Sequence, residues 1–376
     1  MKKMKKIIII SIMFCLFFSI KPIDNIKSLE TNIIYVDDNY NNSTNGWLED
    51  HFNNIQDAVN KSKNNDIIYI KNGIYKENLV IYKSVSLIGE KNNLTIIDGC
   101  YKLDTIKITA NNVKLKNLFI KNSGNDSKDS GIKILSNLNI LDNNKIKNNS
   151  IGILLYDCSK NVIKKNNISS NIYGIGVENC KSSNNISNNI IHNNNLSGIY
   201  LSYTINNNIC KNLIFNNKFG IALSFSDNNI IIENSIKNNL NDGFNIYKSD
   251  KNEFSKNKII TSYNGYIIIN SKSNNINQNT IKNINNIGIF LYKNNSDTII
   301  QNNIIENSSI GINISYDSKN NQIDNNFFSN VNQKIILIKE KIDKNKPQIE
   351  VIIGLIIINS ILLYLIYIKI LKKTKK

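Results

Sequence analysis

Residues 198–219 read GIYLSYTINNNICKNLIFNNKF, and units of the same design recur along most of the chain. Most units open with Gly-Ile-x and a further aliphatic residue, as in Gly-Ile-x-Leu, and continue with short Asn-x-Ile segments. A fixed period of this size is typical of repeat proteins, whose units bury their apolar faces only by stacking on one another. The opening glycines lie 21 to 24 residues apart and are Gly131, Gly152, Gly174, Gly198, Gly220, Gly243, Gly265, Gly288 and Gly311.

Three short apolar segments per period, joined by Asn and Gly, predict an all-β fold, namely a right-handed parallel β-helix with a period of about 22–23 residues. Inward side chains of successive coils should stack into columns of Ile and Leu. We expect glycine to form one corner and asparagine another, because both tolerate a left-handed backbone and stacked amides can hydrogen-bond along the rod. The asparagines predicted for this structural role are Asn166, Asn188, Asn212, Asn234, Asn257, Asn279 and Asn302.

The two ends of the chain carry membrane signals. A lysine-rich start is followed by an apolar run over 7–20, which predicts an export signal. A second apolar run over 349–368 is long enough to cross a bilayer, and the lysines behind it should stay cytoplasmic. The chain is therefore expected in the cell membrane, single-pass, with a large extracytoplasmic domain.

These observations predict six parts. Between the two ends, Phe52, Ile55, Ala58 and Val59 show helical spacing, so a short helix should cap the first coil. The predicted parts are an export segment at 1–30, an N-terminal strand, loop and capping helix at 31–64, the β-helix at 65–331, a juxtamembrane linker at 332–348, a transmembrane helix at 349–369 and a basic tail at 370–376.

The formal net charge of +17 is concentrated in the two tails, where ten lysines flank the apolar runs. The remaining positive charge is thinly spread, and the chain has no arginine, the residue best suited to bidentate phosphate recognition. Nucleic acid is therefore not an expected partner.

At this point the repeat phrase resembles the NosD-type right-handed parallel β-helices of the pectin-lyase-like superfamily. The upstream segments Val36 to Tyr40, His51 to Ala58, Asn72 to Asn78 and Leu87 to Glu90 are similar to the N-terminal module of archaeal surface proteins of that type. The resemblance covers residues 33 to 331 and implies the fold. It implies several functions, because this coil serves enzymes, binding proteins and structural proteins alike.

The sequence lacks residues that the chemistries implied by the resemblance require. Copper delivery calls for soft ligands, yet Met1, Met4 and Met13 lie in the export signal, and His51 and His192 are far apart in sequence. Pectate-lyase-like sites use an arginine, and alginate-epimerase-like sites use an Asp-Pro-His-Asp motif that is missing here. We therefore expect no cofactor, no metal and no catalytic residue. The alternative is a polysaccharide-processing enzyme, a lyase, hydrolase or epimerase, and a copper-accessory role ranks below it.

A binding surface has better support, because aromatic residues recur on or beside the outward side of the glycine strand. Exposed aromatic rings along a groove can stack on sugar rings. The predicted function is envelope structure or recognition of carbohydrate or a surface, with a polysaccharide or envelope glycan as partner. The candidate binding residues are Tyr156, Tyr200, Tyr203, Phe225, Tyr247, Phe290, Tyr292 and Tyr316.

Two cysteines complete the set of candidates. Cys158 and Cys180 each lie six residues after a repeat glycine, so adjacent coils should place them side by side. They are predicted to be stacked thiols that fill a column of small side chains, and a disulfide between them is the other interpretation.

Overall fold

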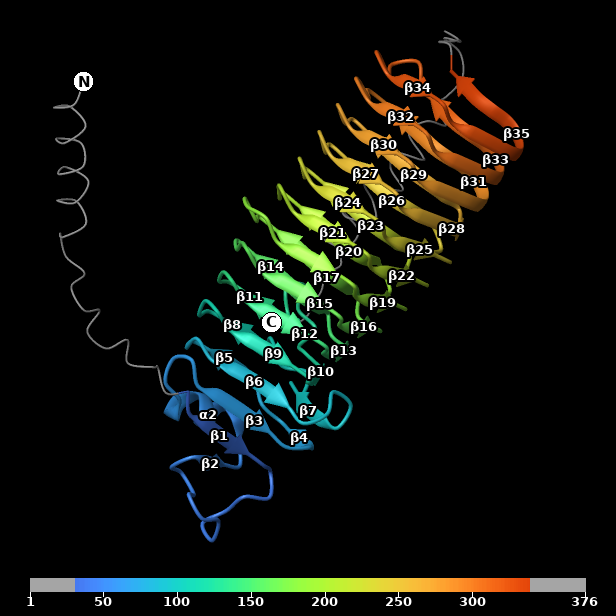
Figure 1. Cartoon of the computed structure of the whole chain (residues 1–376). Helices are drawn as coiled ribbons and strands as arrows, with labels where there is room; N and C mark the ends of the chain where they lie inside the picture. The colour runs from blue at the N-terminus through green and yellow to red at the C-terminus, as the bar shows by residue number, and fades with distance from the viewer. Residues whose placement is uncertain (1–30, 339–376) are drawn as a thin grey trace, which may run out of the picture. The chain divides into compact units, whose positions relative to one another are not determined.

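A computed structural model describes residues 31–338 as a rod of stacked parallel coils (Figure 1). The predicted export segment, transmembrane helix and basic tail lie outside these residues. Within the described part of the chain, no helix is both long and apolar enough to cross a bilayer. The prediction of an all-β parallel β-helix is confirmed, because every strand pairing within this rod is parallel and joins equivalent residues of neighbouring coils.

The rod has three faces. Face 1 is a 14-stranded sheet, in spatial order β2 (His51–Phe52), β1 (Ile33–Val36), β3 (Ile67–Ile70), β6 (Ser86–Gly89), β9 (Lys114–Lys116), β12 (Ile140–Asp142), β15 (Val162–Lys164), β18 (Asn185–Ser187), β21 (Asn208–Cys210), β24 (Ile230–Ile232), β27 (Glu253–Ser255), β30 (Asn275–Asn277), β32 (Ile299–Gln301) and β34 (Gln322–Asp324).

Faces 2 and 3 form one sheet of 21 strands. Face 2 contains β4 (Gly73–Tyr75), β7 (Thr95–Asp98), β10 (Phe119–Lys121), β13 (Lys145–Lys147), β16 (Asn167–Ser169), β19 (Ile190–His192), β22 (Leu213–Phe215), β25 (Ser235–Lys237) and β28 (Lys258–Ser262). Face 3 contains β5 (Leu79–Ile81), β8 (Ile106–Ile108), β11 (Ser130–Ile134), β14 (Ile151–Tyr156), β17 (Tyr173–Glu178), β20 (Ser197–Ser202), β23 (Phe219–Ser224), β26 (Asp242–Tyr247) and β29 (Asn264–Ile269). The last strands run from face 2 onto face 3 and are β31 (Thr280–Tyr292), β33 (Ile304–Ile314) and β35 (Phe327–Leu337).

Inward side chains form continuous apolar columns. On face 1, Ile163, Ile186 and Ile209 follow one another in register and are fully buried. Coils lie roughly 4.8 Å apart, so each inward side chain packs on its equivalents above and below. The ladder of strands begins with β2 and β1, in the segment predicted to hold an N-terminal strand and capping helix, and ends in β35.

One helix, α2 (Ile55–Lys61), packs at the N-terminal end of the rod (Figure 1). Its buried Ile55, Ala58 and Val59 join the same core as the strands. The side chain of Glu77 accepts hydrogen bonds from the backbone N–H groups of Ile55 and Gln56, at 2.8 and 2.9 Å. These bonds satisfy N–H groups in the first turn of a helix, which have no partner within the helix itself.

Buried asparagines form three ladders along the rod. In each ladder the side-chain Nδ2 of one coil donates to the Oδ1 of the equivalent asparagine in the next coil. Five predicted residues lie in the second ladder, but Asn188 and Asn302 are exposed, and Asn189 and Asn303 lie in it instead. The ladders are Asn139, Asn161, Asn184, Asn207, Asn229, Asn252 and Asn274; then Asn144, Asn166, Asn189, Asn212, Asn234, Asn257, Asn279, Asn303 and Asn326; and Asn149, Asn171, Asn194, Asn217 and Asn239.

The expectation that the repeat glycines provide a left-handed corner is wrong. Among the glycines of residues 31–338, only Gly46 has a positive φ, whereas Gly220 lies inside strand β23. A Cβ on Gly220 would lie 2.5 Å from the backbone oxygen of Gly243 and 2.6 Å from a side-chain methyl of Ile236. Glycine is therefore required because neighbouring coils approach too closely for a side chain. Left-handed corners are taken by two of the predicted asparagines, Asn188 (φ 57) and Asn302 (φ 55), and by residues such as Lys211 (φ 57). The five predicted asparagines of the second ladder do not have a positive φ, so for them the expected left-handed corner is wrong.

Candidate functional site

The predicted aromatic residues fall into separate groups. Tyr156, Tyr200 and Tyr247 lie on face 3, whereas Tyr203 and Phe225 occupy the corners that follow β20 and β23. The face 3 rows between them contain Gly176, Ala222 and Ile267, which interrupt the expected stripe. Further along, Phe290 and Tyr292 pack against each other at 5.2 Å between ring centroids, and Tyr316 is half exposed.

One group is a continuous exposed surface, here called the aromatic ledge: Tyr203, Phe225, Tyr247 and Lys248. The rings of Tyr203 and Phe225 are parallel to within 3°, with centroids 4.7 Å apart. Tyr247 meets Phe225 edge-on at 5.7 Å, and the Lys248 Nζ lies 5.2 Å from the Phe225 centroid.

The local backbone explains the shape of the ledge. Tyr203 and Phe225 have φ of 52° and 50°, and each donates its backbone N–H to the next coil, Tyr203 to the carbonyl of Ser224 and Phe225 to the carbonyl of Tyr247. Equivalent corners repeat at the coil spacing, so their side chains stack in parallel. The exposed fractions are 59% for Tyr203 and 37% for Phe225, which leaves apolar ring surface open to a ligand.

A second group, here called the tyrosine–carboxylate cluster, consists of Lys128, Tyr156, Tyr173, Glu178 and Tyr200. The Tyr200 hydroxyl donates to Glu178 Oε1 at 2.6 Å. The Lys128 Nζ lies 3.7 Å from Glu178 Oε2 and 4.8 Å from the centroid of the Tyr156 ring. The Tyr173 and Tyr200 rings are 4.7 Å apart.

Three members of this cluster, Lys128, Tyr173 and Glu178, are not among the predicted binding residues. Tyr200 lies over Gly176, where an added Cβ would be 2.5 Å from the ring. A glycine in the outward row, one coil before a tyrosine, is the sequence signal that could have identified the contact. Lys128 comes from the longer connection between β10 and β11, and no repeat pattern places it.

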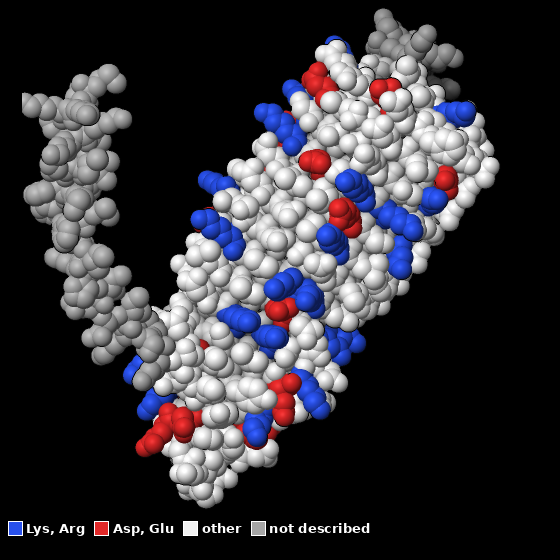
Figure 2. Space-filling view, in the orientation of Figure 1, with Lys and Arg blue, Asp and Glu red and all other residues white. Residues whose placement is uncertain are grey.

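The cluster adjoins the ledge. Glu178 pairs with Ser202 in the next coil, and the backbone N–H of Asn179 donates to the Ser202 carbonyl beside Tyr203. The two groups therefore form one surface of aromatic rings, with lysines at both ends and one carboxylate. Figure 2 shows lysine and acidic side chains dispersed along the rod, with wide uncharged areas between them.

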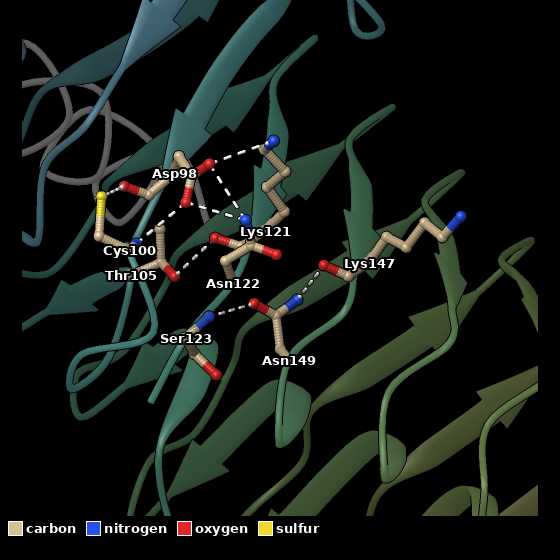
Figure 3. Close-up of polar contacts among 8 residues, drawn as sticks. All are labelled: Asp98, Cys100, Thr105, Lys121, Asn122, Ser123, Lys147 and Asn149. Carbon is tan, nitrogen blue, oxygen red and sulfur yellow. Dashed lines mark hydrogen bonds and ion pairs between the residues drawn. The ribbon is translucent and has the colours of Figure 1, made fainter. Parts of the chain in front are cut away.

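Face 2 has an acidic group of a different kind (Figure 3). Asp98 accepts hydrogen bonds from the backbone N–H of Cys100 at 2.9 Å and from Asn122 Nδ2 at 3.0 Å, and it pairs with Lys121 at 3.1 Å. Burial alone would raise the pKa of Asp98, but these donors together hold it below its ordinary value. Because these partners are all residues of the rod, we assign Asp98 a structural role. Asn149, also shown in Figure 3, has a structural role too: its Oδ1 accepts from the backbone N–H of Ser123 and its Nδ2 donates to the carbonyl of Lys147.

We expect Asp98→Asn to flatten the acid dependence of stability. A depressed pKa means that folding favours the ionised carboxylate, so its contribution is complete above about pH 4 and is lost as the pH falls through the lower folded-state value. Denaturant midpoints measured from about pH 6 down to about pH 2 should fall less for the variant than for the unaltered chain. Parallel curves for the two proteins would contradict this assignment.

Cys158 and Cys180 lie in adjacent coils with their Sγ atoms 3.8 Å apart, and both are buried free thiols. The neighbouring thiol and burial together raise the pKa of Cys158. No group of three or more His, Cys, Asp or Glu within residues 31–338 is placed to hold a metal.

The two described histidines lie at different places on the rod and do not form a site together. His192 stacks on Phe215 at 4.8 Å on face 2, while His51 lies between Tyr35 and Tyr40 at the N-terminal end. Two recesses on the described surface have volumes of about 390 and 310 Å³, and both are open and lined mainly by asparagine. The aromatic ledge and the adjoining cluster are therefore the candidate binding surface among the described residues.

Comparison with known proteins agrees with this fold. Residues 23–242, 142–269 and 197–352 match the family model described as Periplasmic copper-binding protein (NosD). No curated protein matches the chain.

Solved structures with the same architecture are distant in sequence. A double mutant of the periplasmic alginate epimerase AlgG has a TM-score of 0.52 at 18% identity, over 73% of this chain and 77% of its own. Pectate lyase Pel9A has a TM-score of 0.52 at 16% identity, over 65% and 79%. The Dettilon tailspike protein (gp208) has a TM-score of 0.55 at 14% identity, over 78% and 68%. At these identities the likeness shows the fold alone.

Proposed function

The chain belongs to the NosD family, and we propose that it is a non-enzymatic β-helix protein of the cell envelope that binds carbohydrate through the aromatic ledge. One observation carries the proposal: Tyr203 and Phe225 present parallel, exposed rings at the coil spacing. Because the two rings cover one face of each other, a sugar ring would stack on a ring face that remains open or contact the ring edges, and a linear glycan could continue along the rod.

The surroundings of the ledge are polar in a way that suits a hydroxyl-rich ligand. Lys248 lies beside Phe225 and Tyr247, and Glu178 with Tyr200 continues the surface toward the N-terminal end. Amide, hydroxyl and ammonium groups can form hydrogen bonds with sugar hydroxyls, while the aromatic rings supply apolar contact. In the proposal, the apolar run over 349–368 anchors this domain to the membrane after export.

The described donor set does not fit a copper site, although the family description names copper. Cys158 and Cys180 are the soft donors brought together, but both are buried, the pKa of the Cys158 thiol is raised by its neighbour and by burial, and no third His, Cys, Asp or Glu of residues 31–338 joins them. Copper(I) and copper(II) sites use thiolate, thioether or imidazole ligands, and the described histidines lie on different parts of the rod. We therefore assign no function to a metal.

The ledge gives a direct binding test. We expect Tyr203→Ala and Phe225→Ala each to weaken glycan binding about tenfold, because each removes one stacking ring. Full-length protein in mild detergent would be screened on a glycan array, and the affinity for the best polymer would be measured by calorimetry. Tyr101→Ala is the matched control, since Tyr101 is 64% exposed and lies near the N-terminal end of the rod.

Three outcomes would contradict the proposal. These are no binding to any polymer, equal binding by the ledge variants and the control, or release of sugar products from the bound polymer. The last would favour a polysaccharide-processing enzyme, for which hydrolysis would need a second carboxylate facing Glu178.

A further inference from the structure

Among residues 31–338, no element covers the interior of the rod at its C-terminal coil. On β35, Ile335 and Leu337 continue the inward columns of Ile312 and Ile314, with which they pair. Ile312 and Ile314 are 0% and 6% exposed, whereas Ile335 and Leu337 are 46% and 62% exposed. Within the described part of the chain, core positions at this end are therefore left uncovered.

The backbone at this end is open as well. Within the described residues, β34 pairs only with β32, and β35 only with β33. The outer edge of the last coil thus presents N–H and C=O groups without a strand partner, which favours pairing with another strand.

The N-terminal end differs. There α2 buries Ile55, Ala58 and Val59 against the first coils and closes the core. A head-to-tail filament would need both ends open, so the capped end excludes it. Tail-to-tail contact uses the same surface on both copies and closes as a dimer.

The chain just beyond β35 is poorly suited to covering the exposed core. Residues 339–348 read KEKIDKNKPQ, in which Ile342 is the single strongly apolar side chain. A segment of this composition cannot replace the apolar surface that a further coil would supply.

The sequence of β35 complements itself in antiparallel pairing. It begins with Phe327 and Phe328, ends with Ile335, Ile336 and Leu337, and between them has polar residues apart from Val331. When two copies meet about a two-fold axis near the middle of the strand, the aromatic end of each lies against the aliphatic end of the other. Cross-strand pairs of this kind stabilise antiparallel sheets.

We propose that two copies of this chain join tail to tail through the open coil formed by β34 and β35. The contact would continue the sheets across the two-fold axis, bury Ile335 and Leu337, and place the outward Phe327 against the partner copy. The inference is independent of the carbohydrate proposal, because the aromatic ledge lies several coils away on β20 to β26.

Light scattering coupled to size exclusion, with the full-length chain in mild detergent, would test the dimer. We expect a protein mass of two chains, and at least a tenfold rise in the dimer dissociation constant for the double variant Phe327→Lys with Leu337→Lys. Both positions are already exposed, at 59% and 62%, so circular dichroism should show an intact β-helix. The control Ile230→Lys changes a residue that is 44% exposed on face 1 and should leave the dimer intact.

A single-chain mass at all concentrations would overturn the proposal. A dimer that persists unchanged in the double variant would also overturn it, because association would then run through another part of the chain, such as the apolar run over 349–368.

Discussion

Replacing Asn189 by alanine should destabilise the middle of the rod by about 3 to 5 kcal/mol, since several buried polar groups would lose partners at once. The Asn189 side chain accepts from the backbone N–H and the Nδ2 of Asn166, at 2.9 and 3.0 Å. Its own Nδ2 donates to the carbonyl of Ile163 at 2.8 Å and to Asn212 at 3.0 Å. Alanine supplies none of these bonds and leaves the buried backbone N–H of Asn166 without its acceptor.

The neighbouring residue provides a sharp control. Asn188 is exposed and has a left-handed backbone, and Lys211 takes the equivalent corner in the next coil with the same φ of 57°. Asn188→Lys should therefore cost less than about 1 kcal/mol. Urea unfolding would compare the variants, and hydrogen exchange of β16, β19 and β22 would locate the loss, because stability in a repeat array is largely local. Equal effects of the two substitutions would contradict the ladder.

This pair of residues also shows where sequence reasoning reached its limit. The period and the alternation of Ile with polar residues predicted the coils and their inward columns. The Asn188-Asn189 and Asn302-Asn303 dipeptides left the register ambiguous by one residue, and a shift of one moves a side chain from the interior to solvent. The third ladder, from Asn149 to Asn239, went unrecognised because its spacing is hidden among many other asparagines.

The candidate site was less predictable than the fold. The aromatic residues were visible in the sequence, but corner positions such as Tyr203 and Phe225 stack only because the turns repeat in register. The contact between Tyr200 and Glu178 depends on a glycine, Gly176, in the outward row. Lys128 reaches Glu178 from an irregular connection, for which a repeat pattern carries no information.

Substitution of a repeat glycine should also destabilise the rod strongly. We expect Gly220→Ala to destabilise the rod by about 3 kcal/mol or more, since the new methyl group would meet atoms that have no room to move. The nearest are the backbone oxygen of Gly243 at 2.5 Å and a methyl of Ile236 at 2.6 Å. Ile236 is fully buried, so relief requires separating two coils of the ladder.

Gly176→Ala is the control, because it makes the same substitution in the outward row of β17. It distinguishes the effect of close contact between coils from a general effect of alanine in these strands. Its Cβ would meet the ring of Tyr200, an outward side chain that can rotate away from Glu178. We expect a loss in unfolding free energy of about 1 kcal/mol or less, together with weaker glycan binding if the tyrosine–carboxylate cluster takes part in recognition. Urea unfolding and calorimetry on the two variants would distinguish the cases. Similar destabilisation by both would mean that the strand backbone, and not the approach of Gly243, makes alanine unfavourable at these positions.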